Sequence, residues 1–224
     1  MKVRSVVLFL ALALAVGFAV PASAATIVLT FEGLQNSEPI LDFYNGGLGG
    51  MGSGPGPAYG IVFGADSLAL IDADNGGGGN FANEPSPSTV AYFLSGPGVI
   101  MNVPGGFTTG FSFFYSANSV GSVTVYDGLD GTGNLLATLP LALNWQNGGC
   151  VGDPTGLYCN WDPIGVAFGG TALSVNFSGG ANFIAFDDVT LGSTTPGAVP
   201  EPGSLLLLGT GLVGLGRAWR KRRG

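Results

Sequence analysis

The chain has 224 residues, of which 46% are hydrophobic and only 9% are charged, with a formal net charge of −7 and no histidine. Every lysine and arginine lies within residues 2–4 or 217–223, so the segment of residues 25–195 holds 13 carboxylates and no base, and Glu201 is the fourteenth carboxylate. A net charge near −13 on this segment argues against nucleic acid, anionic lipid and acidic polymers as partners. It favours neutral, hydroxyl-rich ligands or bound cations such as Ca²⁺.

The N-terminal segment, residues 1–24, reads as a secretory signal peptide with a signal helix. Two bases precede an apolar run over residues 6–20, and the small residues Ala22 and Ala24 close it. We predict that signal peptidase cuts between Ala24 and Ala25. A transmembrane helix is the alternative, but the run is short for one.

Residues 25–192 are predicted to form one all-β domain, an antiparallel two-sheet sandwich. The 41 glycines and 14 prolines of the chain separate short runs rich in Val, Phe, Ile, Leu and Thr, and no helical period stands out. A jelly roll is the favoured topology and a barrel is the alternative. The expected strands cover residues 26–31, 60–63, 67–71, 90–94, 99–103, 110–116, 122–127, 135–139, 165–168, 173–177 and 182–191.

Two stretches of this domain, residues 45–57 and 74–87, are too rich in glycine for strands. Long loops of this kind are either mobile or part of a binding surface. The residues 128–134 between two expected strands form the clearest hairpin turn.

The only two cysteines, Cys150 and Cys159, are expected to form a disulfide, because the chain is exported. A metal pair is the alternative, but two thiolates without histidine make a poor zinc site. Trp145, Tyr158 and Trp161 gather around this loop. They could stack on sugar rings as an exposed platform or lie buried under the loop.

The last expected strand breaks its own alternation. Ile184 and Phe186 share one face, whereas Val189 and Leu191 share the other. Both pairs can reach the core only if the chain slips by one residue, so we predict a β-bulge near Asp187-Asp188.

The C-terminal part has a fixed order of features. Residues 193–198 form a small, polar linker, and Val199-Pro200-Glu201-Pro202 follows it. An apolar run over residues 205–215, for which we expect a tail helix, precedes five bases over residues 217–223. Such bases are retained on the cytoplasmic side of a membrane. An ordinary anchor is the alternative, although a spanning helix needs about 20 apolar residues.

This order over residues 199–224 resembles the PEP-CTERM sorting signal. The resemblance implies a protein exported by a Gram-negative bacterium and held transiently in the inner membrane. An exosortase, a membrane cysteine transpeptidase, would then recognise Val199, Pro200, Glu201 and Pro202 and cut there.

A second resemblance rests on Thr30-Phe31-Glu32-Gly33 and on the segment 186–191 around Asp187 and Asp188. Together they are similar to galactose-binding-like jelly rolls and carbohydrate-binding modules. That family holds a structural Ca²⁺ between its first and last strands, which implies Glu32 with Asp187 or Asp188 as ligands. The alternative is that these acids accept hydrogen bonds from loop amides.

Three functions remain open. We favour an exported envelope or matrix protein, structural or adhesive in an exopolysaccharide layer. A module that binds neutral polysaccharide is the second hypothesis. A polysaccharide hydrolase with two carboxylates is the third, and we expect no enzyme activity, because the exported body lacks the histidine and cations that most catalytic sites need.

Overall fold

The structure is a computed structural model that describes residues 26–96, 98–146, 150–151 and 156–197. The predicted signal helix, the tail helix and the residues of both cleavage signals lie outside this part: Ala22, Ala24, Ala25, Val199, Pro200, Glu201 and Pro202. No helix within the described residues is long and apolar enough to cross a membrane.

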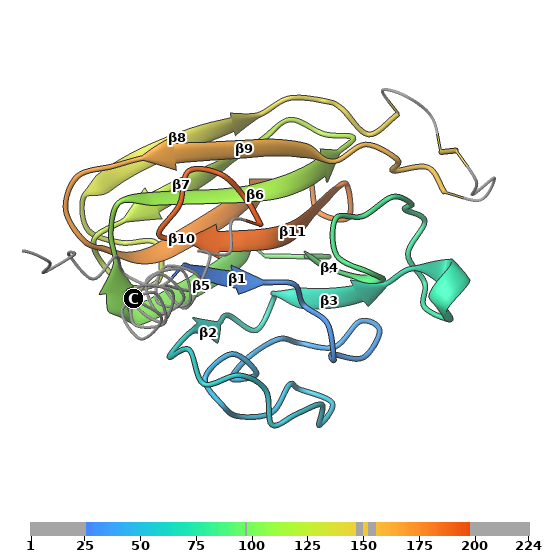
Figure 1. Cartoon of the computed structure of the whole chain (residues 1–224), viewed down its shortest axis with the longest axis horizontal. Coiled ribbons are helices and arrows are strands. Elements are labelled where there is room, and N and C mark those ends of the chain that lie inside the picture. Colours follow the sequence, from blue (N-terminus) through green and yellow to red (C-terminus); the bar gives the residue numbers. More distant parts are fainter. Residues whose placement is uncertain (1–25, 97, 147–149, 152–155, 198–224) are drawn as a thin grey trace, which may run out of the picture.

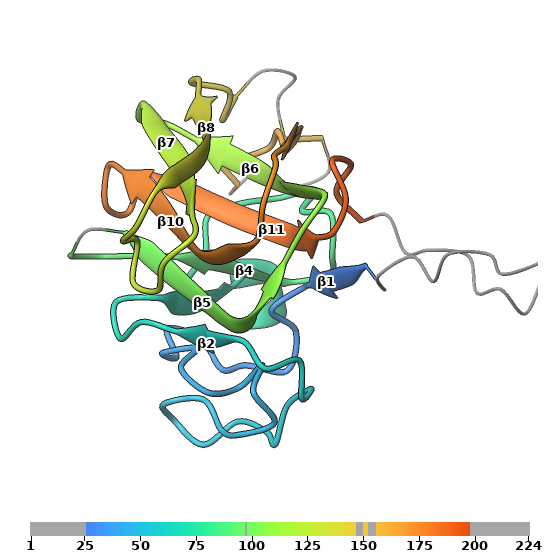
Figure 2. The same cartoon turned by 90° about the vertical axis from the view of Figure 1, so that its left-hand side faces the viewer.

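Within the described residues, eleven strands form two antiparallel sheets (Figures 1 and 2). In the first sheet the order is β3-β4-β11-β6-β9, with β1 also paired to β11, and in the second it is β2-β5-β10-β7-β8. The strands are β1 (Ile27–Leu29), β2 (Val62–Phe63), β3 (Leu68–Ile71), β4 (Thr89–Tyr92), β5 (Val99–Phe107), β6 (Gly110–Ala117), β7 (Gly121–Tyr126), β8 (Leu135–Leu141), β9 (Asp162–Ala167), β10 (Ala172–Gly179) and β11 (Ile184–Leu191), and a 3-10 turn, η1, covers Ala73–Asn75.

The strand order settles the topology. Strands β4 to β11 alternate between the sheets as β4-β11-β6-β9 and β5-β10-β7-β8, apart from the hairpin of β7 and β8. This is the arrangement of a jelly roll, in which eight strands make two facing four-stranded sheets. The predicted two-sheet sandwich is confirmed, and the barrel alternative is wrong.

The core lies between the sheets because alternate residues of each strand point inward. Phe111 and Phe113 of β6, Phe177 of β10 and Phe186 of β11 are all at most 1% exposed. Their rings pack edge to face, with centroids 4.8 Å apart for Phe177 and Phe186. Each such pair contributes about 1 kcal/mol beyond the apolar area that it buries.

The predicted bulge in β11 is confirmed. Asp187 pairs with Phe114, but Thr190 pairs with Ser112, so β11 uses one residue more than β6 over this interval. Asp188 takes a left-handed backbone with φ of 46° at the bulge. As a result all four apolar residues of the broken pattern lie in the core: Ile184, Phe186, Val189 and Leu191.

Every predicted strand overlaps an observed one, but several boundaries differ. The first is shorter, because Phe31 has a φ of 61° and leaves the extended conformation. β5 continues to Phe107 through Pro104, where its pairing with β10 is irregular and needs no N–H donor. β9 starts earlier, at Asp162, and β11 starts later, because Asn182 is left-handed with a φ of 67°.

The glycine-rich stretch 45–57 is organised by a buried carboxylate. Glu38 is fully buried, and its two oxygens accept hydrogen bonds from the backbone of Gln35, Met51 and Ser53 and from the Ser53 hydroxyl. A Cβ at Gly49 would lie 2.5 Å from Glu38 Oε1, so glycine is needed there. The composition alone had left open whether this stretch is mobile.

We expect Glu38→Gln to destabilise the fold by about 3 kcal/mol, because an amide nitrogen would face donors that now bind a carboxylate. Urea denaturation at pH 7 measures the change. Asp74→Asn, at an exposed carboxylate of η1, is the matched control and should change the free energy of unfolding by less than about 0.5 kcal/mol. Equal effects of the two substitutions would contradict this role of Glu38.

Candidate functional site

Two loops that are far apart in the sequence lie together on the outer face of the six-stranded sheet. The backbone N–H groups of Leu157 and Tyr158 both donate to the Asn80 carbonyl, at 2.7 and 3.1 Å. Ala82 N–H donates in turn to the Tyr158 carbonyl at 2.9 Å, and Phe81 and Tyr158 form a parallel bridge. The segment between β3 and β4 is thereby joined to the segment that carries the cysteines.

The predicted disulfide between Cys150 and Cys159 is present, with Cα atoms 4.8 Å apart. Cys159 is buried, and its N–H donates to the Trp145 carbonyl at 2.8 Å. The carbonyl of Cys159 accepts a bond from the Asn83 side chain. The disulfide therefore closes the same loop that supports Tyr158.

The two tryptophans for which a sugar platform was considered, Trp145 and Trp161, are half-buried and pack against neighbouring residues. Trp161 donates from Nε1 to the Ala82 carbonyl at 3.0 Å and packs edge-on against Phe81. Trp145 packs against Tyr158 with ring centroids 5.7 Å apart. Trp161 therefore holds the two loops against each other, whereas Trp145 packs within the disulfide segment. Both rings are half-buried, which is intermediate between the exposed platform and full burial.

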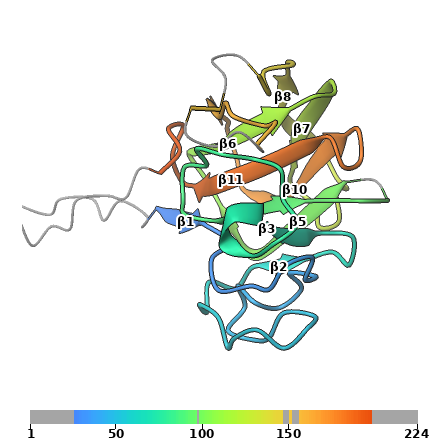
Figure 3. The same ribbon diagram turned by 90° about the vertical axis from the view of Figure 1, so that its right-hand side faces the viewer.

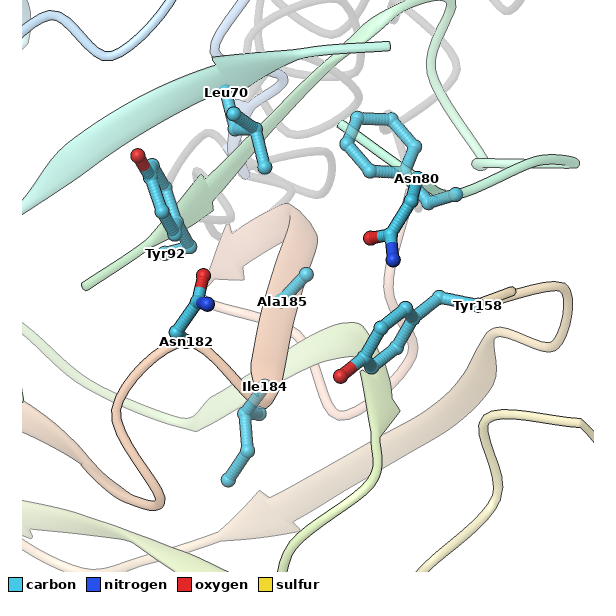
Figure 4. A pocket seen from close by; sticks show the side chains of 8 residues that line it. Leu70, Asn80, Tyr92, Tyr158, Asn182, Ile184 and Ala185 are labelled. Carbon is cyan, nitrogen blue, oxygen red and sulfur yellow. The ribbon is translucent and has the colours of Figure 1, made fainter. Parts of the chain in front are cut away.

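These loops and the sheet enclose a shallow cleft (Figure 4). Its floor is apolar and includes Ala185, and the rings of Tyr92 and Tyr158 stand on opposite sides of it. The side-chain amides of Asn80 and Asn182 point into the space between them. The remaining lining residues are Leu70, Phe81 and Ile184.

The polar groups of the cleft differ in how they are held. Tyr92 Oη is 3.3 Å from the Ser37 hydroxyl, and Tyr158 is hydrogen-bonded to the Asn118 side chain. Burial raises the pKa of Tyr158, so this hydroxyl stays protonated at neutral pH. Neither Asn80 nor Asn182 has a side-chain hydrogen bond to another described residue, so both amides can serve a ligand.

Of the three aromatic residues that the sequence singled out, Tyr158 lines the cleft, whereas Trp145 and Trp161 do not. Sequence reasoning missed Tyr92, Asn80 and Asn182. The glycine-rich stretch 74–87 gave a signal for Asn80, since such loops often form binding surfaces. Nothing in the sequence indicated that Tyr92 and Asn182 would meet it.

The carboxylates considered for calcium have protein donors. Glu32 accepts bonds from Thr89 N–H at 2.8 Å and from the hydroxyls of Thr89 and Ser88. Asp187, fully buried, accepts bonds from Ser86 N–H at 2.9 Å and from the Ser86 hydroxyl at 2.7 Å. The segment 84–89 thus joins the first strand region to the last strand.

No three Asp, Glu or Cys side chains of the described residues are grouped so that they could hold a metal ion. Asp188 is half-buried beside Asp187, and burial raises its pKa. The donor set matches the hydrogen-bonded alternative for Glu32 and Asp187. Calcium at Glu32, Asp187 and Asp188 stays a prediction that a titration can decide.

Residues 198–223 match the family profile of the PEP-CTERM protein-sorting motif. The chain carries a PEP-CTERM sorting signal. This motif marks an exported protein that has a membrane-anchoring tail before an exosortase processes it. No curated protein sequence matches the chain.

Among solved structures, a carbohydrate-binding module of Cellvibrio mixtus lichenase 5A in complex with cellotriose matches 58% of this chain and 88% of its own, at 14% identity and a TM-score of 0.32. The xylanase 10B modules of Clostridium thermocellum, complexed with xylohexaose, match 62% of this chain and 26% of their own chain, at 16% identity and a TM-score of 0.34. The K3 adhesin domain of Lys-gingipain from Porphyromonas gingivalis matches 78% of this chain and 94% of its own chain, at 17% identity and a TM-score of 0.31. Likenesses this low carry no argument about function.

Burial raises the pKa of the Asp187 carboxyl to about 8, with Asp188 adding to the rise and Ser86 opposing it. An acid with a raised pKa in the folded state stabilises the fold fully below its unfolded pKa, near 4, and loses that contribution as pH rises towards 8. We therefore expect the thermal midpoint to fall by about 5 °C or more from pH 5 to pH 8 in EDTA. Asp187→Asn should flatten this fall, because it removes the titrating group.

The calcium hypothesis predicts a different result. An ion shared by Glu32 and Asp187 would hold both carboxylates ionised and would stabilise the native state by mass action. Added Ca²⁺ would then raise the midpoint at pH 8 and EDTA would lower it. A midpoint that is the same in Ca²⁺ and in EDTA at every pH would exclude the calcium site.

Proposed function

We propose that this protein is an exported, acidic jelly roll that binds neutral polysaccharide through the Tyr158 cleft and so contributes adhesion in an exopolysaccharide layer. The observation that carries the proposal is the cleft itself. Two tyrosine rings, and two amides without a hydrogen-bond partner among the described residues, stand around an apolar floor. A disulfide and a set of backbone hydrogen bonds hold this arrangement in place before any ligand binds.

The chemistry of the cleft suits a neutral sugar. Tyrosine rings pack against the apolar C–H faces of pyranose rings, and amides both donate to and accept from sugar hydroxyls. An anionic glycan would find no cation in the exported body, which contains no Lys, Arg or His between residues 5 and 216. Electrostatic repulsion would keep such a glycan away.

The small size of the cleft favours a polymer that is bound along one of its sides. The cleft is open to solvent on one side, and its volume of about 30 Å³ is far too small to enclose a sugar ring. A sugar unit would therefore rest mainly against Tyr158 without being engulfed, because Tyr158 is half-buried whereas Tyr92 is only 5% exposed and forms part of the wall of the cleft. Affinity for one site would be weak, and adhesion would come from many copies displayed along one polymer.

The residues that line the cleft include no carboxylate. A glycosidase needs an acid and a second carboxylate on either side of the bond that it cleaves. The cleft is thus composed for binding, and the adhesive role fits it better than polysaccharide hydrolysis does.

We expect Tyr158→Ala and Asn80→Ala each to weaken binding to a neutral polysaccharide about tenfold, because each removes one face of the cleft. Affinity electrophoresis in gels that contain neutral or acidic polysaccharide measures this. The matched control is Tyr126→Ala, at a half-buried tyrosine on β7 of the other sheet, which should bind like the parent. Binding that survives both cleft substitutions would remove the proposed site.

Processing gives a separate prediction. The intact mass of the mature protein should lack residues 1–24 and the tail beyond the region of Pro200 to Pro202, so that every Lys and Arg is gone. Glu201→Ala should leave the tail attached, since it removes the charge of the sorting signal. Mature protein that retains Trp219 and the basic residues would refute processing.

A further inference from the structure

The segment that follows β11 is docked on the domain, although its composition predicted a linker. We call residues 193–197 the strap. It lies on the outer face of the six-stranded sheet, over β6 and β9, and ends one residue before the part of the chain that matches the sorting motif. The strap therefore connects the folded domain directly to the sorting signal.

Hydrogen bonds hold the strap at both of its ends. The Ser112 hydroxyl on β6 donates to the Ser193 carbonyl at 3.0 Å. At the other end Gly197 N–H donates to Thr190 Oγ1 of β11, also at 3.0 Å. Inside the strap, Thr195 N–H donates to Ser193 Oγ at 3.0 Å, which makes a compact turn.

Two glycines of the sheet make room for the strap. A Cβ at Gly165 of β9 would lie 2.1 Å from the Thr194 carbonyl oxygen, and one at Gly110 of β6 would lie 2.8 Å from Thr194 Cγ2. Neither glycine has a positive φ, so their backbone conformation would accept a side chain. What these positions require is the absence of a Cβ beneath the strap.

Docking shortens the reach of the sorting signal. Pro200 lies three positions after Gly197, and a fully extended chain covers at most about 10 Å over that interval. If the strap is undocked as far as Leu191, Pro200 lies nine positions beyond the end of β11. A fully extended chain of that length reaches at most about 30 Å from the sheet. A folded domain of this size has a radius of gyration of about 15 Å, so the docked form keeps the signal close to its surface.

We propose that Gly110, Ser112, Gly165 and Thr190 are positioning residues for tail processing, because they dock the strap and so limit the access of the membrane-embedded exosortase to the sorting signal. The undocked strap is then the form that is cut. This inference rests on exosortase processing of the tail, which the sorting motif indicates. It adds that the folded domain itself sets the rate of its own release.

The test is the rate of tail removal from the full chain, followed by pulse-chase in cells that contain an exosortase. Gly165→Ala should speed tail removal about fivefold. Weakening the docked form by the equivalent of one hydrogen bond raises the population of the undocked strap about fivefold. Gly169→Ala is the matched control, because no atom lies within 4 Å of its added Cβ. Ser112→Ala is a second route to undocking that adds no bulk to the sheet.

Two further readouts separate docking from other effects. Hydrogen exchange should show that Gly197 N–H loses protection in Gly165→Ala and keeps it in Gly169→Ala. Six Gly-Ser residues inserted after Gly197 should speed processing of the parent chain and add little in the Gly165→Ala background, because both changes extend the same reach.

Equal processing rates for the parent, Gly165→Ala and Ser112→Ala, with exchange showing an undocked strap, would overturn the proposal. A parent chain that never loses its tail in these cells would instead remove the sorting interpretation, and the proposal with it. Faster processing in Gly169→Ala as well would show that the rate follows substitutions in general, which also contradicts a role for the strap.

Discussion

The bulge in β11 is the constraint on which the rest of the structure depends. β11 lies between β6 on one side and β4 and β1 on the other, and its two halves would face opposite directions without an extra residue. The bulge turns both halves into the core and leaves Asp187 fully buried. A bare buried carboxylate is costly, so the fold must supply donors to it.

Those donors organise the outer face of the sheet. Ser86 donates twice to Asp187, which holds the long segment between β3 and β4 against β11, as Figure 3 shows for the green segment in front of that strand. Once this segment is fixed, Asn80 and Phe81 come to lie beside Tyr158, and the cleft follows. Because the exported body lacks bases, its buried carboxylates accept hydrogen bonds from N–H and hydroxyl groups, where other proteins would use ion pairs. Glu32 and Glu38 are stabilised in the same way.

The two functional features occupy opposite ends of one strand. The cleft uses Ile184 and Ala185 at the start of β11, whereas the strap leaves after Leu191 and is pinned by Thr190. An eight-residue strand spans about 25 Å, so the cleft lies well away from the strap. A domain still anchored by its tail could thus present the cleft outward, and the strap would govern when it is released.

The sequence alone determined the class of fold, the strands and the bulge, because alternation of apolar residues and turn residues between them are local signals. It also determined the sorting signal, since composition and order along one segment suffice for it, and the pairing of two cysteines that have no other partner. Tertiary structure decided what depends on register and on loops meeting in space. It placed Asn80, Tyr92, Tyr158 and Asn182 around one cleft, gave Glu38 its ring of donors, and turned a predicted linker into a docked strap, because each of these contacts joins residues that no sequence period relates.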